Sequence, residues 1–268
     1  MDRTRIALDK ARSRGIGGRP VFSVLPLPTH NSRTGPIEYR TTRIVELDPR
    51  ILYANRVVGG MSGEPLADIY RILRTQVLKR LAAAGKTTFA VCSANSEDGK
   101  TLTAVNLALS MAMDVNQTVL LVELDLRKPS LAQMLGIEPD AGIDDYLQGR
   151  VELSECLINP GIERLVILPA RGTVAKSSEL LASPKMQQLA QELKTRYPDR
   201  LVMYDLPPLL ATDDCLAFLP NVDATLFVAR EGMTTESQIE RSLELLKSST
   251  ILGTVLNFST QTEFDAYL

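Results

Sequence analysis

Six short segments of the chain are apolar on both faces, and helical patterns alternate with them. The segments are residues 88–92, 118–124, 165–168, 201–205, 224–229 and 251–257. Strands that are covered by helices on both sides have this composition, because neither face meets water. Helical spacing occurs at residues 65–84, 101–113, 177–181, 184–196 and 235–248. The alternation predicts an α/β fold, a doubly wound and mostly parallel sheet flanked by helices.

The octapeptide Ala94-Asn-Ser-Glu-Asp-Gly-Lys-Thr101 lies between the first of these strands and the helical stretch that follows it. A phosphate-binding P-loop occupies this position, because backbone N–H groups and the helix N-terminus then face one anion. The side chain of Lys100 can reach phosphate oxygens, and the hydroxyl of Thr101 can reach Mg²⁺. We therefore expect nucleotide contacts from Asn95, Ser96, Glu97, Asp98, Gly99, Lys100, Thr101 and Leu102. The alternative is a polar turn before a helix.

A second copy of the tripeptide, Gly85-Lys86-Thr87, provides an internal control. It follows a helical pattern and precedes a strand, so its amides would face no phosphate site. We expect Gly85 to cap the C-terminus of the helix and to be followed by a turn, as glycine commonly does.

Two of the predicted strands end in carboxylates. The first reads Val119-Leu-Leu-Val-Glu-Leu-Asp-Leu-Arg127, and the second reads Leu201-Val-Met-Tyr-Asp-Leu-Pro-Pro208. Acids at the carboxyl ends of parallel strands lie in the crevice where ligands bind, and they can hold Mg²⁺ or accept a proton. Either acidic segment alone could merely cap the next helix or turn. Together with the P-loop they predict a Mg²⁺–nucleotide site.

Composition divides the chain into four parts. Residues 1–36 form a flexible arm rich in Gly and Pro, and the first twenty residues carry six basic side chains against two acidic ones. A short basic helix is expected at 3–14. Residues 37–64 are expected to be an extended segment that packs on the domain, 65–258 to be the P-loop domain, and 259–268 to be a tail. Within the domain, Leu66, Ile69, Leu73 and Val77 mark the apolar face of the first helix.

Bulk properties exclude several classes of protein. The formal net charge of −2 argues against a nucleic-acid partner. The three cysteines lie far apart in or beside apolar runs, which predicts reduced core residues in a cytoplasmic protein. Because no apolar run reaches membrane-spanning length, we expect any association with the inner face of a membrane to depend on a partner or on the basic arm.

With these motifs in order, the chain resembles the bacterial tyrosine kinases of capsule and exopolysaccharide loci, particularly their exosortase-associated branch. That family has a Walker A loop, a Walker A′ strand of the form Asp-x-Asp-x-Arg and a Walker B strand ending Asp-x-x-Pro. The matching segments here are residues 94–101, 123–129 and 205–208, and the similarity covers about 65–258. The resemblance implies ATP-Mg²⁺-dependent autophosphorylation on tyrosine.

The resemblance also implies roles for individual residues. Catalytic roles fall on Lys100, Glu123, Asp125 and Arg127, and metal binding falls on Thr101, Asp125 and Asp205. Asn257, at the end of the last strand, would contact the adenine edge or, alternatively, shape a turn. Arg127 would pair with the neighbouring acids or anchor the loop before Pro129.

Two further features of the family concern assembly. Its self-association motif, Glu-x-x-Arg-x-x-Arg, is matched by Asp68, Arg71 and Arg74, although an ordinary helix with a charged outer face would look the same. The resemblance implies a ring of subunits and a transmembrane activator, the polysaccharide co-polymerase of the same locus. Tyr267 is either the phosphoacceptor or a plain tail residue.

Three departures from the family pattern bear on activity. Glu123 replaces the first Asp of the A′ motif, Glu97 stands where the P-loop commonly has Gly, and the tail holds one tyrosine instead of a cluster. Glu97 would have to adopt a turn that glycine makes more easily. These departures leave open a second function, a nucleotide-binding regulator with weakened phosphotransfer that acts by ATP-dependent assembly. A partitioning ATPase of the ParA/MinD type, which shares the fold, is a third.

Overall fold

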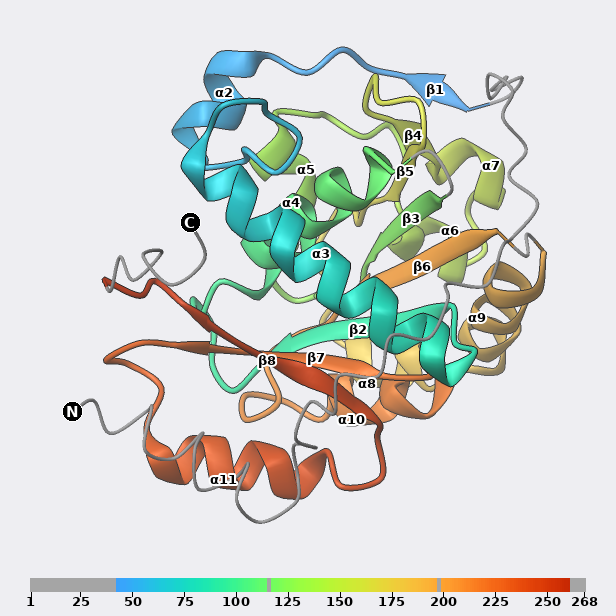
Figure 1. Cartoon of the computed structure of the whole chain (residues 1–268). Coiled ribbons are helices and arrows are strands. Elements are labelled where there is room, and N and C mark those ends of the chain that lie inside the picture. The colour runs from blue at the N-terminus through green and yellow to red at the C-terminus, as the bar shows by residue number, and fades with distance from the viewer. Residues whose placement is uncertain (1–41, 115–116, 197–198, 261–268) are drawn as a thin grey trace.

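The computed structural model describes residues 42–114, 117–196 and 199–260. They form an eight-stranded sheet with the order β1-β4-β5-β3-β6-β2-β7-β8 (Figure 1). Its strands are β1 (Arg43–Ile44), β2 (Thr88–Ser93), β3 (Thr118–Glu123), β4 (Ile158–Asn159), β5 (Leu165–Leu168), β6 (Arg200–Asp205), β7 (Thr225–Arg230) and β8 (Ile251–Asn257). The predicted α/β class and mostly parallel sheet are confirmed, and all six predicted strands are present.

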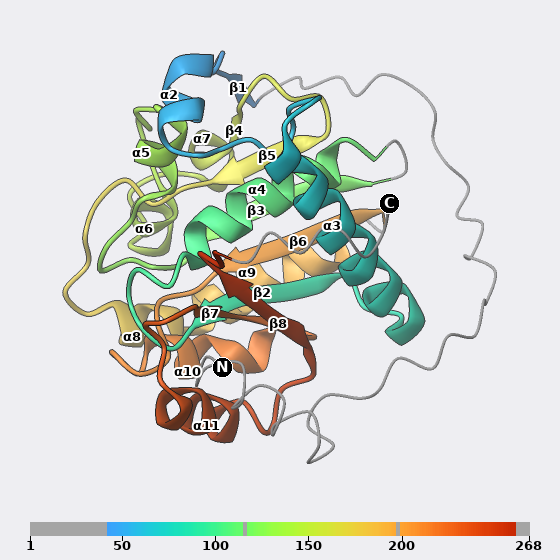
Figure 2. The same ribbon diagram turned by 60° about the vertical axis from the view of Figure 1, so that its left-hand side comes forward.

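Helices cover both faces of the sheet, and in Figure 2 α3 lies in front of the strands and α9 lies behind them. One face packs against α2 (Pro49–Ala54), α3 (Pro65–Ala84), α4 (Lys100–Ala112) and α5 (Leu131–Leu135). The other packs against α6 (Ile143–Leu147), α7 (Leu153–Cys156), α8 (Ser177–Leu181), α9 (Pro184–Thr195), α10 (Asp214–Phe218), the 3-10 helix η1 (Leu219–Asn221) and α11 (Glu236–Leu245). Side chains of each strand alternate between the two cores.

The sheet contains one antiparallel pair of strands. Strand β4 pairs with β5 antiparallel, and β1 pairs with β4 in parallel at the edge of the sheet. Both β1 and β4 contain only two residues. Such short strands carry no readable alternation, which is why the sequence did not predict them.

The buried face of α3 differs from the expected one. Its buried residues are Ala67, Tyr70, Val77 and Leu81, whereas Leu66 and Ile69 are about two-fifths exposed. The expected apolar face is therefore confirmed at Val77 and at Leu73, which packs against the core, and is wrong at Leu66 and Ile69. The helix ends as predicted at Gly85, which is left-handed with φ +62°, so the second Gly-Lys-Thr tripeptide follows the end of a helix instead of opening one.

The segment preceding α3 is not extended throughout. Asp48 caps a helix at its N-terminus by accepting a hydrogen bond from the Arg50 N–H at 2.8 Å, and Pro49 occupies the first turn. This Asp-Pro pair is a helix-start signal that the alternation of neighbouring residues concealed. The expected helix at 3–14 and the rest of the arm lie outside the described residues. Within the described ranges, no helix combines the length and apolar composition needed to cross a bilayer.

Asn106, in the middle of α4, fastens the segment before α3 to the core. Its Oδ1 accepts hydrogen bonds from the N–H groups of Val58 and Gly59, both at 2.7 Å, and its Nδ2 donates to the Arg56 carbonyl. Gly59 lies so close to the Asn106 backbone that any Cβ would collide with it. A single buried side-chain amide of α4 thus ties this helix to the segment that precedes α3.

We expect Asn106→Ala to lower the free energy of unfolding by about 2–4 kcal/mol, because two buried N–H groups lose their acceptor. Chemical denaturation measures the change. Asn55→Ala is the control, since its side chain makes one hydrogen bond, to the Met134 carbonyl, and should cost about 1 kcal/mol. Equal losses in the two variants would contradict the clamp.

Candidate nucleotide and phosphoryl-transfer site

The order of the central strands brings the three sequence motifs together. Strands β3, β6 and β2 are neighbours, and all three run parallel. In the register, Glu123 of β3 and Val91 of β2 lie opposite Asp205 of β6. The P-loop and both acidic segments therefore meet at one edge of the sheet, as the sequence predicted.

Lys100 and Asp125 form a buried ion pair. The Lys100 Nζ lies 2.8 Å from Asp125 Oδ2, and both side chains are about one-tenth exposed or less. Burial lowers the pKa of Lys100, but the negative charges of Asp205 and Asp125 outweigh it, so the pKa stands above its ordinary value. The lysine is consequently a fixed cation at the mouth of the loop.

Thr101 and Asp205 form the second contact of the site. The Thr101 hydroxyl donates a 2.6 Å hydrogen bond to Asp205 Oδ2. The other oxygen, Oδ1, is buried without a hydrogen-bond partner. Burial raises the pKa of Asp205 to about 6, although Lys100 and Thr101 act in the opposite direction.

These residues fit a Mg²⁺ ion. Mg²⁺ takes oxygen ligands and is held by one or two carboxylates while keeping several waters. The unpartnered Oδ1 of Asp205, the Thr101 hydroxyl and the Asp125 carboxylate supply oxygen ligands at one point. Among the described residues, no group of three or more His, Cys, Asp or Glu side chains is placed to hold a metal, so a Mg²⁺ ion here would need the Thr101 hydroxyl, water and phosphate for its remaining ligands.

Glu123 lies beside the site but is occupied by the backbone. Its Oε1 accepts hydrogen bonds from the N–H groups of Ser130 and Leu131 at 2.6 and 2.7 Å, and its Oε2 accepts from the Ala170 N–H at 3.1 Å. Burial raises the pKa of Glu123 to about 7 in spite of these amides. The longer arm reaches the start of α5 and holds a loop, whereas Asp125 contacts Lys100 directly. The catalytic role of Glu123 stays a prediction.

Arg127 pairs with none of the acids at the strand ends. Its Nε donates a 2.9 Å hydrogen bond to Oδ2 of Asp214, whose side chain is 1% exposed. Asp214, the first residue of α10, is the partner of Arg127 that the sequence analysis missed. Its place in the segment that follows Asp205 and the two prolines is the signal that could have found it.

Asp98 shapes the P-loop from inside. Its carboxylate accepts hydrogen bonds from the Asn95 N–H at 2.8 Å and from the Thr234 hydroxyl at 3.0 Å, so it braces the loop instead of facing solvent. Gln238 of α11 likewise donates to the Asn95 side chain at 3.0 Å. Ser96 and Glu97 are exposed at the tip.

Glu97 adopts the left-handed conformation that its position demands. Its φ is +67°, one of three positive values among described non-glycine residues. A non-glycine residue in this region costs of order 1 kcal/mol. The expected strain at this position is thus real, and the Arg230 guanidinium, which donates to the Glu97 carbonyl at 3.3 Å, helps to hold it.

The end of β8 packs directly on the P-loop. The Asn257 Nδ2 donates to the Asp98 carbonyl at 3.1 Å, and its Oδ1 accepts from the Phe258 N–H at 2.9 Å. With both ends of the amide engaged, the geometry favours the structural alternative for Asn257 over the adenine contact. Phe258 stacks under the Arg230 guanidinium, 4.4 Å from the ring centroid.

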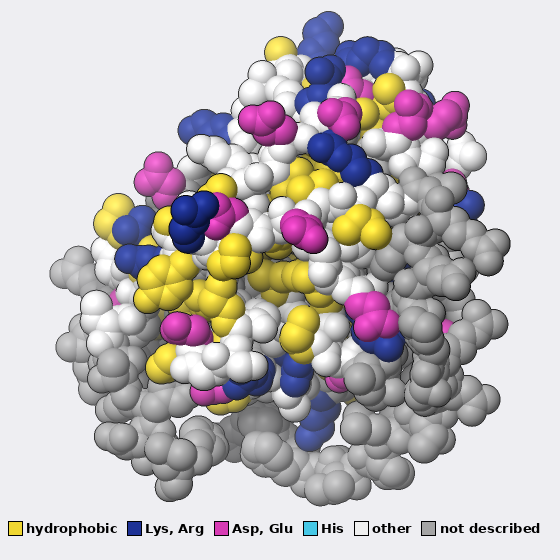
Figure 3. All heavy atoms as spheres, turned by 90° about the horizontal axis from the view of Figure 1, so that it is seen from above, with side chains coloured by type: hydrophobic (Ala, Val, Ile, Leu, Met, Phe, Trp, Pro, Cys, Tyr) yellow, Lys and Arg dark blue, Asp and Glu magenta, His cyan; other side chains and the backbone are white. Residues whose placement is uncertain are grey.

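The three residues of the expected self-association motif separate in the structure. Asp68 and Arg71 form an ion pair on the surface. Arg74 turns inward, and its Nη1 donates to the Ser110 carbonyl of α4 at 2.7 Å. The outer face of α3 instead exposes Leu66, Ile69 and Ile72 at 39–46%. Figure 3, which looks onto α2 and the top of the molecule, shows hydrophobic side chains gathered among charged ones. Tyr267 lies outside the described residues.

Known proteins resemble the chain over most of its length. No family model matches it. Over 219 residues it is 32% identical to the succinoglycan biosynthesis transport protein ExoP of Rhizobium meliloti (strain 1021), which covers 80% of this chain and 27% of ExoP. Over 189 residues it is 31% identical to the tyrosine-protein kinase Wzc of Salmonella typhi, which covers 70% of this chain and 26% of Wzc. The chain spans about a quarter of the length of these relatives.

A solved structure shows the same fold. The kinase domain of Escherichia coli tyrosine kinase ETK superposes with a TM-score of 0.68 at 25% identity, covering 76% of this chain and 82% of that domain. Neither the regulator nor the partitioning ATPase is favoured by these similarities. The sequence identities and this shared fold together establish that the chain belongs to the bacterial tyrosine kinases.

Proposed function

We propose that the protein is an ATP-Mg²⁺-dependent protein-tyrosine autokinase of an exopolysaccharide biosynthesis or export locus. The observation that carries the proposal is the meeting of two contacts at one loop, Lys100 with Asp125 and Thr101 with Asp205. A cation, a hydroxyl and two carboxylates at the N-terminus of α4 are what phosphoryl transfer to a hydroxyl requires. The exosortase-associated branch stays a prediction from the sequence.

Each residue has a distinct task in this mechanism. The loop amides and Lys100 bind the β- and γ-phosphates and stabilise the charge that develops on them. Thr101 and Asp205 would hold Mg²⁺, which would neutralise phosphate charge when bound. Asp125 orients the tyrosine hydroxyl and accepts its proton once Lys100 turns toward phosphate. Arg127, fixed by Asp214, presents its remaining N–H groups at the rim of the site.

Assembly and location complete the proposal. The exposed strip Leu66, Ile69 and Ile72 of α3, with the neighbouring Asp68–Arg71 pair, forms the contact between subunits of a ring. Tyr267 is the phosphoacceptor. The partner is a transmembrane activator of the same locus, which holds the kinase at the cytoplasmic face of the membrane.

We expect Lys100→Ala to abolish phosphotyrosine formation, by at least about 100-fold, because it removes the main cation facing the phosphates. The purified chain is incubated with Mg²⁺-ATP, with and without a membrane activator fragment, and phosphotyrosine is mapped by mass spectrometry. Lys86→Ala, in the second Gly-Lys-Thr tripeptide, is the matched control and should react normally, since the Lys86 Nζ bonds to the Asp223 carbonyl and the Thr250 hydroxyl, away from the P-loop. Nucleotide binding without any phosphotyrosine under all conditions would sink the kinase proposal and favour the regulator.

Glu123→Asp should mainly lower stability, whereas Asp125→Asn should mainly lower activity. Shortening Glu123 withdraws its carboxylate from three amides, so the free energy of unfolding should fall by about 1–3 kcal/mol without a gain in activity. Asp125→Asn should lower the rate of phosphotransfer by about 100-fold and leave the loop intact. Calorimetry and single-turnover phosphorylation separate the two effects. A Glu123→Asp variant that is stable and faster than wild type would show instead that Glu123 is the catalytic acid.

Charge placed on the strip of α3 should dissociate the ring. Ile69→Asp and Ile72→Asp alter exposed side chains, so the fold should tolerate them within about 0.5 kcal/mol. Their assemblies in Mg²⁺-ATP should shift to monomers, as measured by light scattering after gel filtration. Leu216→Asp, at an equally exposed leucine of α10, is the control and should assemble like wild type. Loss of assembly in the control as well would argue against a specific α3 interface.

A further inference from the structure

Tyr53 is the exposed tyrosine of the part of the chain that the structure describes. It lies on α2, at the outer surface of the molecule over α5 (Figure 1), and 64% of the residue is exposed. Tyr70 is 6% exposed and Tyr204 is wholly buried. A phosphoacceptor hydroxyl must enter the active site of a kinase, which these two buried side chains cannot do while the domain is folded.

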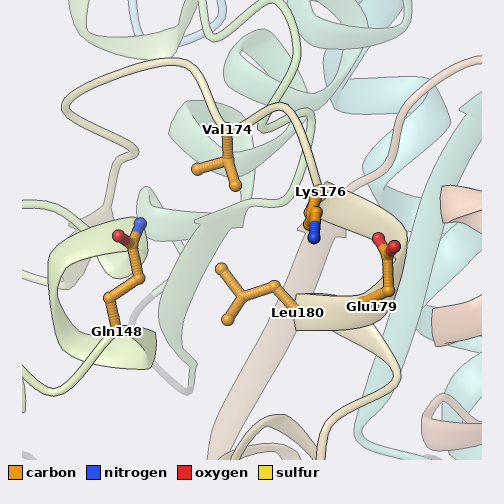
Figure 4. Close-up of a pocket in the computed structure, with 5 residues that line it drawn as sticks. All are labelled: Gln148, Val174, Lys176, Glu179 and Leu180. Carbon is orange, nitrogen blue, oxygen red and sulfur yellow. The ribbon is translucent and has the colours of Figure 1, made fainter.

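Tyr146, on α6, is held by its surroundings. The residue is partly buried, and the Lys185 ammonium lies 4.4 Å from the centroid of its ring. The end of α6 borders a shallow cleft of about 350 Å³, where Figure 4 shows the side chains of Gln148, Val174 and Leu180 turned toward one space. Tyr146, Val174 and Leu180 pack against the same core, so Tyr146 cannot leave α6 without exposing apolar surface.

Helix α2 is weakly held, so Tyr53 can leave it. The helix contains six residues and buries none of them. A helix this short is marginal in water without tertiary packing, and segments with few buried contacts open first. Its attachments to the body include the partly buried Leu52 and one hydrogen bond from the Asn55 Nδ2 to the Met134 carbonyl. Local opening of α2 therefore exposes Tyr53 as an extended segment at small cost.

Arg56, one turn after Tyr53, has an unusual backbone conformation. Its φ is +59°, and it follows the end of α2, where its N–H bonds to the Tyr53 carbonyl and the Val57 N–H bonds to the Leu52 carbonyl. Glycine is the usual residue at this position of a helix end, and a residue with a Cβ is strained there. The Arg56 side chain is exposed, and within the described ranges its guanidinium has no hydrogen-bond or ion-pair partner.

We propose that Tyr53 is a second phosphoacceptor of the kinase and that Arg56 binds the phosphate once it has been transferred. The proposal rests on the kinase function proposed above. The phenol oxygen of Tyr53 attacks the γ-phosphorus of ATP, the bond from this phosphorus to the β–γ bridging oxygen breaks, and ADP leaves while the phenol proton passes to Asp125. The product carries a charge of about −2 and three acceptor oxygens, which suit an unpaired guanidinium.

The backbone of Arg56 is fixed independently of α2. Its carbonyl accepts a 3.0 Å hydrogen bond from the Nδ2 of Asn106, which is fully buried in the middle of α4. The next two residues, Val57 and Val58, are buried as well. The guanidinium therefore stays beside the end of α2 whether or not that helix is open, and a phosphate that returns with Tyr53 finds its partner in place.

Arg50 adds positive charge on the other side of Tyr53. It lies three residues earlier, a spacing that puts two side chains on the same face of a helix. Its guanidinium is 2.9 Å from a carboxylate oxygen of Asp48, which competes with a phosphate for it. The unpaired Arg56 is consequently the main partner of the phosphate, and Arg50 supports it.

Mass spectrometry of the full chain tests the acceptor assignment. After incubation with Mg²⁺-ATP, with and without a membrane activator fragment, we expect phosphate on Tyr53 in the wild type and in Tyr267→Phe, and none in Lys100→Ala. Tyr146 should stay unmodified. The matched control is Ile44→Tyr in a Tyr53→Phe background, because Ile44 is 60% exposed but belongs to β1, which is hydrogen-bonded to β4. Position 44 should be phosphorylated at least about tenfold more slowly than position 53.

Three outcomes would overturn the assignment. Phosphate on Tyr267 alone would refute Tyr53 as an acceptor and leave the proposed kinase function standing. An absence of phosphotyrosine from the whole chain under all conditions would contradict both proposals. Equal rates in the wild type at position 53 and in the Ile44→Tyr control at position 44 would show that exposure alone decides, and that α2 confers no preference.

Arg56→Gly tests the phosphate-binding role. Glycine adopts a positive φ without strain, so this variant should fold at least as well as the wild type. Tyr53 should still be phosphorylated in it, but an added tyrosine phosphatase should remove that phosphate about tenfold faster, because the charge-assisted hydrogen bonds that protect it are lost. Arg56→Lys should restore part of the protection, and removal of phosphate from Tyr267 provides the internal reference. Equal rates of removal from Tyr53 in the wild type and in Arg56→Gly would refute the role of Arg56.

Discussion

The site depends on the burial of three carboxylates together with one ammonium group. Glu123, Asp125 and Asp205 are at most 5% exposed, and Lys100 is 9% exposed. If all were ionised, the cluster would carry a net charge of −2, and unpaired buried charge is costly. The structure answers this in three ways: three amides bind Glu123, Lys100 pairs with Asp125, and the pKa of Asp205 rises to about 6. The remaining negative charge is an attraction for a divalent cation.

The P-loop keeps its shape without a full set of glycines. Glu97 holds a left-handed conformation, and the cost is offset by contacts from outside the loop: Thr234 to Asp98, Arg230 to the Glu97 carbonyl, and Asn257 to the Asp98 carbonyl. Gly99 also has a positive φ, +89°, and a Cβ there would displace the Asn257 amide from the Asp98 carbonyl. Contacts from the ends of β7 and β8 therefore stabilise a loop conformation that a glycine at position 97 would adopt without strain. The same contacts restrict how the loop can move.

The sequence predicted the central sheet and the main site because both follow from local patterns. Strands buried on both faces are continuously apolar, and the P-loop and the acidic strand ends are contiguous motifs whose convergence follows from parallel topology. Side-chain partners could not be predicted in the same way. Glu123 contacts Ala170, which lies 47 residues further along the chain, and Arg127 contacts Asp214, which lies 87 residues further. Both contacts depend on how distant segments of the chain fold back. The face of α3 was misjudged because a polar residue, Arg74, is drawn inward by a carbonyl of α4.

Helix α4 links the nucleotide site to the surface proposed for assembly. Its first turn carries Lys100 and Thr101, its middle carries Asn106 and the clamp on Val58 and Gly59, and its last turn offers the Ser110 carbonyl to Arg74 of α3. A helix transmits displacement along its axis because its backbone hydrogen bonds are continuous. In the proposed assembly, a nucleotide at the first turn of α4 and a neighbouring subunit on α3 would therefore both act on one rigid element. Nucleotide binding and assembly would then be coupled through the Arg74–Ser110 contact.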